Sequence, residues 1–285
     1  MIMNKTLQRL LTFFIGIPLI LGIIFLDPSQ YHIGINLLAC VCSVLASLEL
    51  YTLLSKNFEL KYKFLLVLLS LLQPLLTFIL FCFKLDMNFS YWIYLIAVML
   101  TLSVEVFTQK TFENSIHRLS ASVFILFYSG FLFSFVPRMT AFKEAKVFIA
   151  LFLFTVFIND SLAWFFGVLF GKNNRGLIAA SPNKSIAGFL GGYAGAVLAC
   201  VFSQKLWPEI FAGPVYKAVI LGLVCATTSI IGDLIESVLK RANQVKDSGN
   251  IIPGRGGILD SVDSILFTAP VYYILVFILF SPEVI

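Results

Sequence analysis

The chain has 285 residues, of which 59% are hydrophobic and only 12% are charged, and its formal net charge is +5. Soluble domains carry roughly 45–50% apolar and about 25% charged residues, so this composition excludes a soluble enzyme, a disordered chain and a collagen-like chain. An integral membrane protein remains, and the scatter of Lys and Arg between apolar runs indicates membrane topology rather than nucleic-acid binding.

Nine apolar runs approach the ~20 residues that a membrane-spanning helix needs. They lie near residues 11–26, 33–54, 64–83, 91–107, 119–136, 147–170, 187–202, 215–231 and 265–280. The first run has a basic start, but no small-residue cleavage site follows it, so we expect a retained helix rather than a signal peptide. The pattern predicts an all-α, polytopic membrane protein with about nine transmembrane helices and a cytoplasmic polar site between the last spans.

The distribution of cations predicts the orientation in the membrane. With nine spans and the N-terminus inside, 14 of the 20 Lys and Arg residues fall in the inside segments. Cytoplasmic loops carry an excess of Lys and Arg. We therefore expect the N-terminus and the polar loops 171–186 and 232–264 in the cytoplasm, and the C-terminus outside.

Two domains are expected. Residues 1–146 would form an N-terminal membrane scaffold of about five spans, and residues 147–285 a catalytic membrane domain of about four. The scaffold carries Glu49 and Glu105 near the ends of apolar runs; either could be a site residue, but helix-end capping or snorkelling to the interface is favoured.

All five cysteines lie in apolar runs, which is typical of free thiols.

The pattern changes at Asn159-Asp160, which interrupts the sixth run. An ionisable group inside a membrane helix costs about 2.5–3.5 kcal/mol on insertion scales and is a functional-site hypothesis by default. The alternative is a structural hydrogen-bond cluster, and we favour a functional role.

The loop after this run combines cations and hydroxyls. Lys172, Lys184 and Ser185 precede the start of the next helix, an arrangement that suits a phosphate group. The helix that follows has two overlapping GxxxG spacings, at 188/192 and 191/195, which predict close helix packing.

A polar stripe begins at residue 233. Asp233, Glu236, Ser237, Lys240 and Arg241 follow the i, i+3, i+4, i+7, i+8 spacing of one helical face. The stripe could be only the wet face of an amphipathic helix at the membrane interface. That alternative does not account for the segment that follows it.

The segment 249–257 contains Pro253 and four glycines and is not expected to form a stable helix. Its glycines would allow the backbone to approach a ligand closely. Asp260 and Asp263 follow one helical turn apart, and such carboxylates suit Mg²⁺, which usually takes one or two of them together with substrate phosphates. Cations, carboxylates and a glycine-rich loop beside a bilayer predict phosphoryl or nucleotidyl transfer to a lipid.

At these residues the sequence resembles the phosphatidate cytidylyltransferase (CDP-diacylglycerol synthase) family. The family signature is matched in register and without gaps by Ser237, Lys240, Arg241, Lys246, Asp247, Gly249, Ile252, Pro253, Gly256, Gly257, Asp260 and Asp263. The resemblance extends upstream through Asn159-Asp160 and Ser181-Pro182, so it covers about residues 159–280.

The sequence departs from the family pattern in three places. Arg255 stands where the family has His, Ser261 where it has Arg, and Lys184-Ser185-Ile186-Ala187-Gly188 where Lys-Thr-Trp-(Glu/Gln)-Gly is usual. The first two changes leave the charge of the loop similar. Arg255 cannot act as a titrating base, because Arg does not deprotonate in proteins.

The resemblance implies transfer of CMP from CTP to phosphatidate, giving CDP-diacylglycerol and pyrophosphate in phospholipid biosynthesis. It implies Mg²⁺ as a cofactor, with a second cation left open, a homodimer, and residence in a plasma or inner membrane with the site facing cytoplasmic CTP. The lipid bilayer is the expected partner, and nucleic acid is not.

Roles are assigned to the matched residues on this basis. The expected catalytic residues are Asp247, Lys246 and Asp263. The expected metal carboxylates are Asp247, Asp260 and Asp263, with Asp233 and Asp160 in support. The expected substrate-binding residues are Lys184, Ser185, Lys172, Ser237, Lys240, Arg241, Arg255, Gly256 and Gly257.

Three other functions stay open at this point. An ion-coupled transporter could use Asp160 and the cytoplasmic carboxylates as an ion path, but we find no internal repeat, which many transporters show. Another CTP-dependent lipid enzyme, such as a lipid-alcohol kinase, would need similar groups. An inactive paralogue would account for Arg255 and Ser261.

Overall fold

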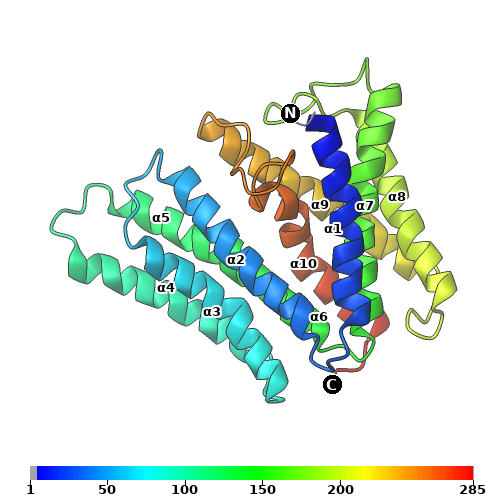
Figure 1. Ribbon diagram of the computed structural model, residues 1–285, viewed down its shortest axis with the longest axis horizontal. Helices are drawn as coiled ribbons and strands as arrows, with labels where there is room; N and C mark the ends of the chain where they lie inside the picture. Colours follow the sequence, from blue (N-terminus) through cyan, green and yellow to red (C-terminus); the bar gives the residue numbers. More distant parts are fainter. Residues whose placement is uncertain (1–4, 285) are drawn as a thin grey trace. The chain divides into compact units, whose positions relative to one another are not determined.

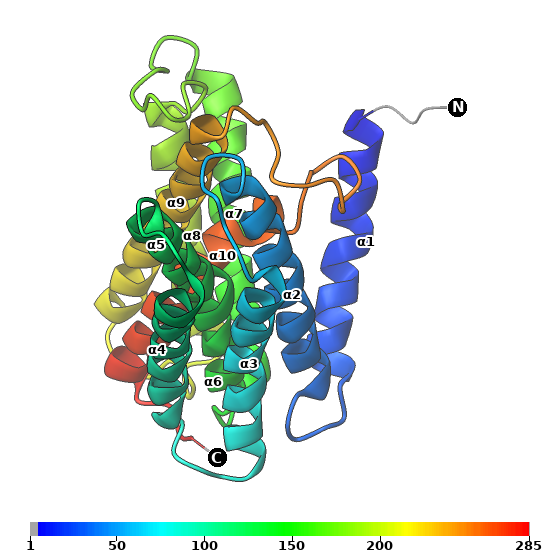
Figure 2. The same cartoon turned by 90° about the vertical axis from the view of Figure 1, so that its left-hand side faces the viewer.

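Every regular element in the described part of the chain is helical (Figures 1 and 2). The structure, a computed structural model, describes the backbone of residues 5–284 and the side chains of residues 14–284. Its helices are α1 (Lys5–Leu26), α2 (Ile33–Leu54), α3 (Lys63–Cys82), α4 (Phe89–Thr108), α5 (Ser115–Ile125), the π-helix η1 (Leu126–Phe131), the 3₁₀ turn η2 (Leu132–Ser134), α6 (Phe135–Thr140), α7 (Ala145–Phe170), α8 (Ile186–Leu206), α9 (Tyr216–Ala242) and α10 (Leu259–Phe280). The predicted all-α class is confirmed.

Eight helical stretches in the described residues are long and apolar enough to cross a membrane. They are α2, α3, α4, the continuous stretch Ser115–Thr140, α7, α8, α9 and α10. The first predicted span falls on α1, whose described apolar part, Phe14–Leu26, is shorter; the side chains of residues 11–13 lie outside the described part. The chain is therefore a polytopic membrane protein, as its composition predicts.

The described chain groups into two compact units. Unit 1 comprises Met1–Ala141 and Ala242–Ser261, and unit 2 comprises Phe142–Arg241 and Val262–Ile285. The segment that joins α9 to α10 thus belongs with the N-terminal helices. The predicted division of the chain at 146/147 stays a prediction.

In unit 1, α3 packs against α2 and against η1, and Figure 2 shows α2 and α3 side by side. The π-helix needs partners from its neighbours because its backbone departs from the regular α-helical ladder. Gln73 Nε2 donates to the carbonyl of Leu126 at 3.1 Å, and Ser43 Oγ donates to that of Ser129 at 2.5 Å. A Cβ on Gly130 would lie 2.5 Å from Gln73 Nε2, so this glycine allows α3 to approach.

In unit 2, α7 and α8 pack closely along the glycines of α8 (Figure 1). A Cβ on Gly191 would lie 2.6 Å from the ring of Phe166, and one on Gly192 would lie 2.7 Å from Asn159 Oδ1. The close packing predicted from the GxxxG spacings is confirmed. Helices α9 and α10 also meet closely, because a Cβ on Gly232 would lie 2.6 Å from the carbonyl oxygen of Asp263.

Candidate functional site

The predicted site residues fall into one group in each unit. Unit 2 contains Asp160, Lys172, Lys184, Ser185, Asp233, Ser237, Lys240, Arg241 and Asp263. Unit 1 contains Lys246, Asp247, Arg255, Gly256, Gly257 and Asp260.

In unit 2, the carboxylate of Asp160 accepts hydrogen bonds from two buried polar side chains. Its Oδ1 accepts hydrogen bonds from Asn159 Nδ2 at 3.1 Å and from Ser229 Oγ at 3.3 Å. Asn159 Nδ2 also donates to Ser229 Oγ at 3.1 Å, and both of these residues are buried. Asp160 itself is exposed, so its carboxylate is fixed in place but accessible to a ligand.

Lys184 connects the loop before α8 to helix α9. Its ammonium forms an ion pair with Asp233, and both groups interact electrostatically with Asp160. Arg241 makes a second connection between the same elements, because its Nε donates to the carbonyl of Ala180 at 3.4 Å. The predicted stripe from Asp233 to Arg241 lies on one helix, as its spacing predicts.

Asp263 is the buried aspartate of the unit 2 group, with 8% of its surface exposed. It interacts electrostatically with Asp233, Glu236 and Asp160, and its Oδ1 accepts the N–H of Ser264 at 2.6 Å. Glu236 is paired with Lys240 one helical turn away. Four carboxylates thus share one region with two ammonium groups, and this excess of negative charge would attract a cation.

The chemistry of this donor set fits Mg²⁺. All of its ligating atoms would be carboxylate oxygens, which are the hard donors that Mg²⁺ prefers. Within the described residues, no three or more His, Cys, Asp or Glu side chains converge closely enough to hold a metal ion alone. Mg²⁺ does not require such a cage, because it usually binds one or two carboxylates and completes its shell with substrate phosphates and water.

In the loop 171–185, the side chain of Ser185 forms a hydrogen bond with the protein backbone. Ser185 is buried and precedes α8 in an extended conformation, and its Oγ accepts the N–H of Gly188 at 3.1 Å. This is the geometry of an N-cap, which satisfies a backbone donor at the start of a helix. Lys172 is exposed in the same loop. The phosphate contacts predicted for both residues stay predictions.

In unit 1, Asp260 organises the glycine-rich segment. Its Oδ2 accepts the N–H of Ser248 at 2.7 Å, the hydroxyl of Ser248 at 2.8 Å and the N–H of Gly257 at 2.8 Å. Three donors on one oxygen give this carboxylate a structural role in its own loop. Its predicted role as a metal ligand is untested.

A tight turn lies between Ile252 and Gly256. The N–H of Ile252 donates to the carbonyl of Gly256 at 2.7 Å, and the reverse bond measures 3.0 Å. Gly256 has a φ of 110°, a conformation that residues with a side chain rarely adopt. Arg255 lies exposed in this turn, and Lys246 and Asp247 are exposed before it.

The sequence patterns do not reveal the contact that Glu49 makes. It lies on α2 and is 7% exposed, and its carboxylate accepts the backbone N–H groups of Ile258 and Leu259, both at 2.9 Å. Glu49 does cap a helix end, but the helix is α10 and not, as expected, its own. Snorkelling to the interface is wrong for this residue, because the carboxylate is buried. A lone carboxylate at the end of an apolar run carries no signal for a partner 209 positions away.

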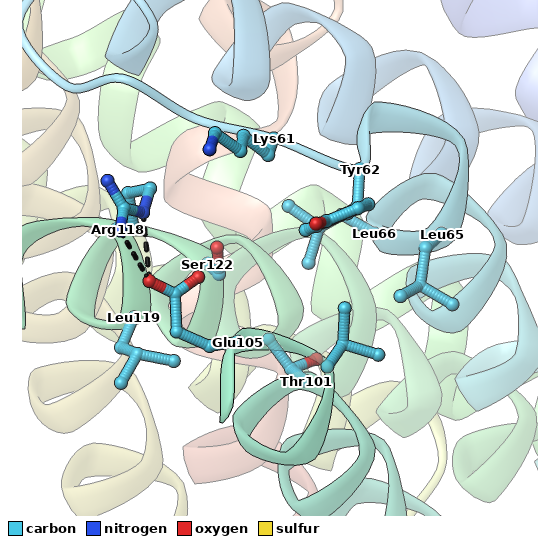
Figure 3. Close-up of a pocket in the computed structure, with 10 residues that line it drawn as sticks. Lys61, Tyr62, Leu65, Leu66, Thr101, Glu105, Arg118, Leu119 and Ser122 are labelled. Carbon is cyan, nitrogen blue, oxygen red and sulfur yellow. Dashed lines mark hydrogen bonds and ion pairs between the residues drawn. The ribbon is translucent and has the colours of Figure 1, made fainter. Parts of the chain in front are cut away.

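The other scaffold carboxylate, Glu105, forms a buried ion pair with Arg118 (Figure 3). Arg118 Nε and Nη2 donate to Glu105 Oε1 at 2.9 and 2.7 Å. The pair lines a small surface recess, whose other lining residues are Lys61, Tyr62, Leu65, Leu66, Thr101, Val104, Leu119 and Ser122. None of the predicted site residues lines this recess.

Comparison with known proteins identifies sequences that this chain resembles. The sequence profile of the cytidylyltransferase family matches residues 7–279 of this chain. The phosphatidate cytidylyltransferase of Thermotoga maritima is 36% identical over 156 residues, which cover 54% of this chain and 57% of that protein. The Bacillus subtilis protein of the same name is 35% identical over 185 residues, which cover 64% of this chain and 66% of that protein.

A third relative, the phosphatidate cytidylyltransferase of Synechocystis, is 41% identical over 129 residues, which cover 44% of this chain and 41% of that protein. The chain thus matches between about two fifths and two thirds of the length of these three curated relatives.

Proposed function

We propose, from the premise that this chain belongs to the cytidylyltransferase family, that it transfers CMP from CTP to phosphatidate and releases pyrophosphate. The product is CDP-diacylglycerol. The observation that carries the proposal is the cluster of Asp160, Asp233 and Asp263, on the membrane helices of unit 2, with Lys184 from the loop before α8. The family membership and the names of the relatives supply the substrate class.

In this reaction a phosphate oxygen of phosphatidate attacks the α-phosphorus of CTP. The bond from that phosphorus to the oxygen of the β-phosphate breaks, and pyrophosphate carries away the electron pair. Both reactants are anions, so the protein must mainly neutralise charge and hold the reacting groups in line. The ammonium of Lys184 and the guanidinium of Arg241 lie on elements that meet in unit 2 and would bind the phosphate oxygens.

Mg²⁺ would be held by one or two of the carboxylates Asp160, Asp233 and Asp263 together with substrate phosphates and water, and when bound it supplies positive charge to the phosphate oxygens. Asn159 and Ser229 keep the Asp160 carboxylate in one orientation before a ligand arrives. Lys184 neutralises Asp233 in the free protein, and it can pass to a phosphate oxygen when Asp233 binds a cation instead. A second cation stays open.

The membrane setting fits a lipid substrate. Apolar helices would keep the acyl chains of phosphatidate in the bilayer while its phosphate reaches the polar residues. The excess of Lys and Arg in the predicted inside segments supports a site that faces the cytoplasm, with the N-terminus inside and the C-terminus outside. We extend the proposal to a plasma or inner membrane and to a homodimer, as the family resemblance implies.

The test is turnover by the purified protein in detergent–lipid micelles. With labelled CTP, phosphatidate and Mg²⁺ we expect labelled CDP-diacylglycerol, and we expect none with EDTA or with ATP in place of CTP. A parallel reaction with diacylglycerol separates a lipid-alcohol kinase, which would make phosphatidate and CDP. Absence of CDP-diacylglycerol from protein that is shown to be folded would overturn the proposal and would direct attention to Arg255 and Ser261.

A further inference from the structure

We infer that Glu49 is a positioning residue for the proposed transfer. From helix α2 it holds the segment 248–259, called here the anchored segment, in one conformation, and two glycines of that segment make room for its carboxylate. The part of this inference that concerns turnover rests on the proposed function. The part that concerns the conformation of the anchored segment does not.

The hydrogen bonds of Glu49 fix both ends of the anchored segment. Oε1 accepts the N–H of Ile258, and Oε2 accepts the N–H of Leu259. The hydroxyl of Ser248, whose single hydrogen is shared with the nearer Asp260 Oδ2 at 2.8 Å, lies 3.2 Å from Glu49 Oε2. Leu259 is the first residue of α10, so the carboxylate satisfies donors that have no acceptor within the helix. Its negative charge is also favourable at a helix N-terminus.

Two glycines of the anchored segment, Gly249 and Gly257, face the same carboxylate. A Cβ on Gly249 would lie 2.5 Å from Glu49 Oε1 and 2.8 Å from its carboxyl carbon, and its three nearest atoms all belong to Glu49. A Cβ on Gly257 would meet Glu49 Oε2 more closely still. Neither glycine has a positive φ, so the conformational freedom of glycine does not explain why these residues lack a side chain. The space that the Glu49 side chain occupies explains it.

A second contact from the same end of α2 reaches the start of the connection between α9 and α10. Asn57 Nδ2 donates to the carbonyl of Ala242 at 3.1 Å and to Asn243 Oδ1 at 2.9 Å. Helix α2 and the turn after it therefore hold this connection at both ends. Lys246, Asp247 and Arg255, which carry predicted catalytic and binding roles, lie in the connection between these two anchors.

Glu49 would act through this segment rather than on the substrate. Both of its oxygens are occupied by donors of the protein, and the residue is buried. Its loss would free the backbone that carries the signature residues without removing any group that touches CTP or phosphatidate. This combination is what defines a positioning residue.

The first experiment measures hydrogen exchange in wild-type protein, in Glu49→Gln and in the control Glu105→Gln. Gln keeps the shape of the side chain but lacks the charge and presents only one acceptor oxygen. We expect the amides of Ile258 and Leu259 to exchange about tenfold faster in Glu49→Gln. Glu105 is the other buried scaffold carboxylate, and its change should leave these two amides at the wild-type rate. Unchanged exchange in Glu49→Gln would overturn the inference.

The second experiment uses the contact between Gly249 and Glu49 as a double-mutant cycle. Gly249→Ala pushes the carboxylate away from its donors, so we expect kcat to fall about tenfold, as in Glu49→Ala, with KM for phosphatidate held within about twofold. In the double variant the added methyl group has nothing to displace, and we expect no loss beyond that of Glu49→Ala. Gly256→Ala is the matched control, because its strain comes from φ and from Asp260 Oδ2, which would lie 2.6 Å from the added Cβ, and it should persist in the Glu49→Ala background.

The outcomes separate this inference from the proposed function. A wild-type protein without transferase activity contradicts the proposed function, while the exchange rates of Ile258 and Leu259 still test the anchor. An active wild type in which Gly249→Ala is harmless, or in which its loss adds fully to that of Glu49→Ala, contradicts the inference alone.

Discussion

The carboxylate of Asp263 is buried and has other negatively charged groups around it. Asp233, Glu236 and Asp160 all interact with its carboxylate, and the only hydrogen bond described to that carboxylate comes from the N–H of Ser264. A buried carboxylate among other carboxylates is costly unless a cation compensates it. Such residues are retained for function rather than for stability.

We therefore predict that Asp263→Asn removes activity without unfolding the protein. The loss of a metal or charge-compensating carboxylate should lower kcat by at least about a hundredfold. Tm in detergent should hold or rise, because one of four neighbouring negative charges is gone. Asp86→Asn, on an exposed loop residue, is the control and should change neither quantity. Normal turnover by Asp263→Asn would remove this residue from the site.

Helix packing decides how firmly the unit 2 site is held. Gly192 faces Asn159, and Asn159 in turn donates to Asp160 and Ser229. The GxxxG spacing predicts the close approach of a neighbouring helix, but it does not say which residue lies opposite the glycine. That pairing depends on the rotation of both helices, which a sequence pattern does not fix.

We predict that Gly192→Ala damages both stability and activity. The added methyl group would push Asn159 away from Asp160, and overpacking of this kind costs about 1–3 kcal/mol. Gly22→Ala on α1 is the matched control, because its Cβ would find its nearest neighbour only at 3.9 Å. Alanine has the higher helix propensity, so Gly22→Ala should raise Tm slightly or leave it unchanged. Equal effects of the two changes, in thermal unfolding and in turnover, would contradict this view of the packing.

At the scale of the whole molecule, the parts of the fold that depend on local chemistry could be predicted. Apolar runs predict most of the membrane helices, and the i, i+3, i+4 spacing predicts that Asp233 to Arg241 share one helix. The contact of Glu49 with the start of α10 could not be predicted, because it joins residues 209 and 210 positions apart. The π-helix η1 could not be predicted either, because Gln73 and Ser43, which donate hydrogen bonds to its carbonyl groups, come from other helices.

Orientation in the membrane is the last property that sequence chemistry predicts for the whole chain. The Lys and Arg excess predicts that loop 171–186 faces the cytoplasm, and the span count then puts the segment between α8 and α9 outside. In a background without the five native cysteines, we expect Asn173→Cys to react with an impermeant maleimide only after the membrane is opened. Glu209→Cys should react in intact cells. The reverse pattern would place the site on the outer side, away from CTP, and would contradict the proposed supply of substrate.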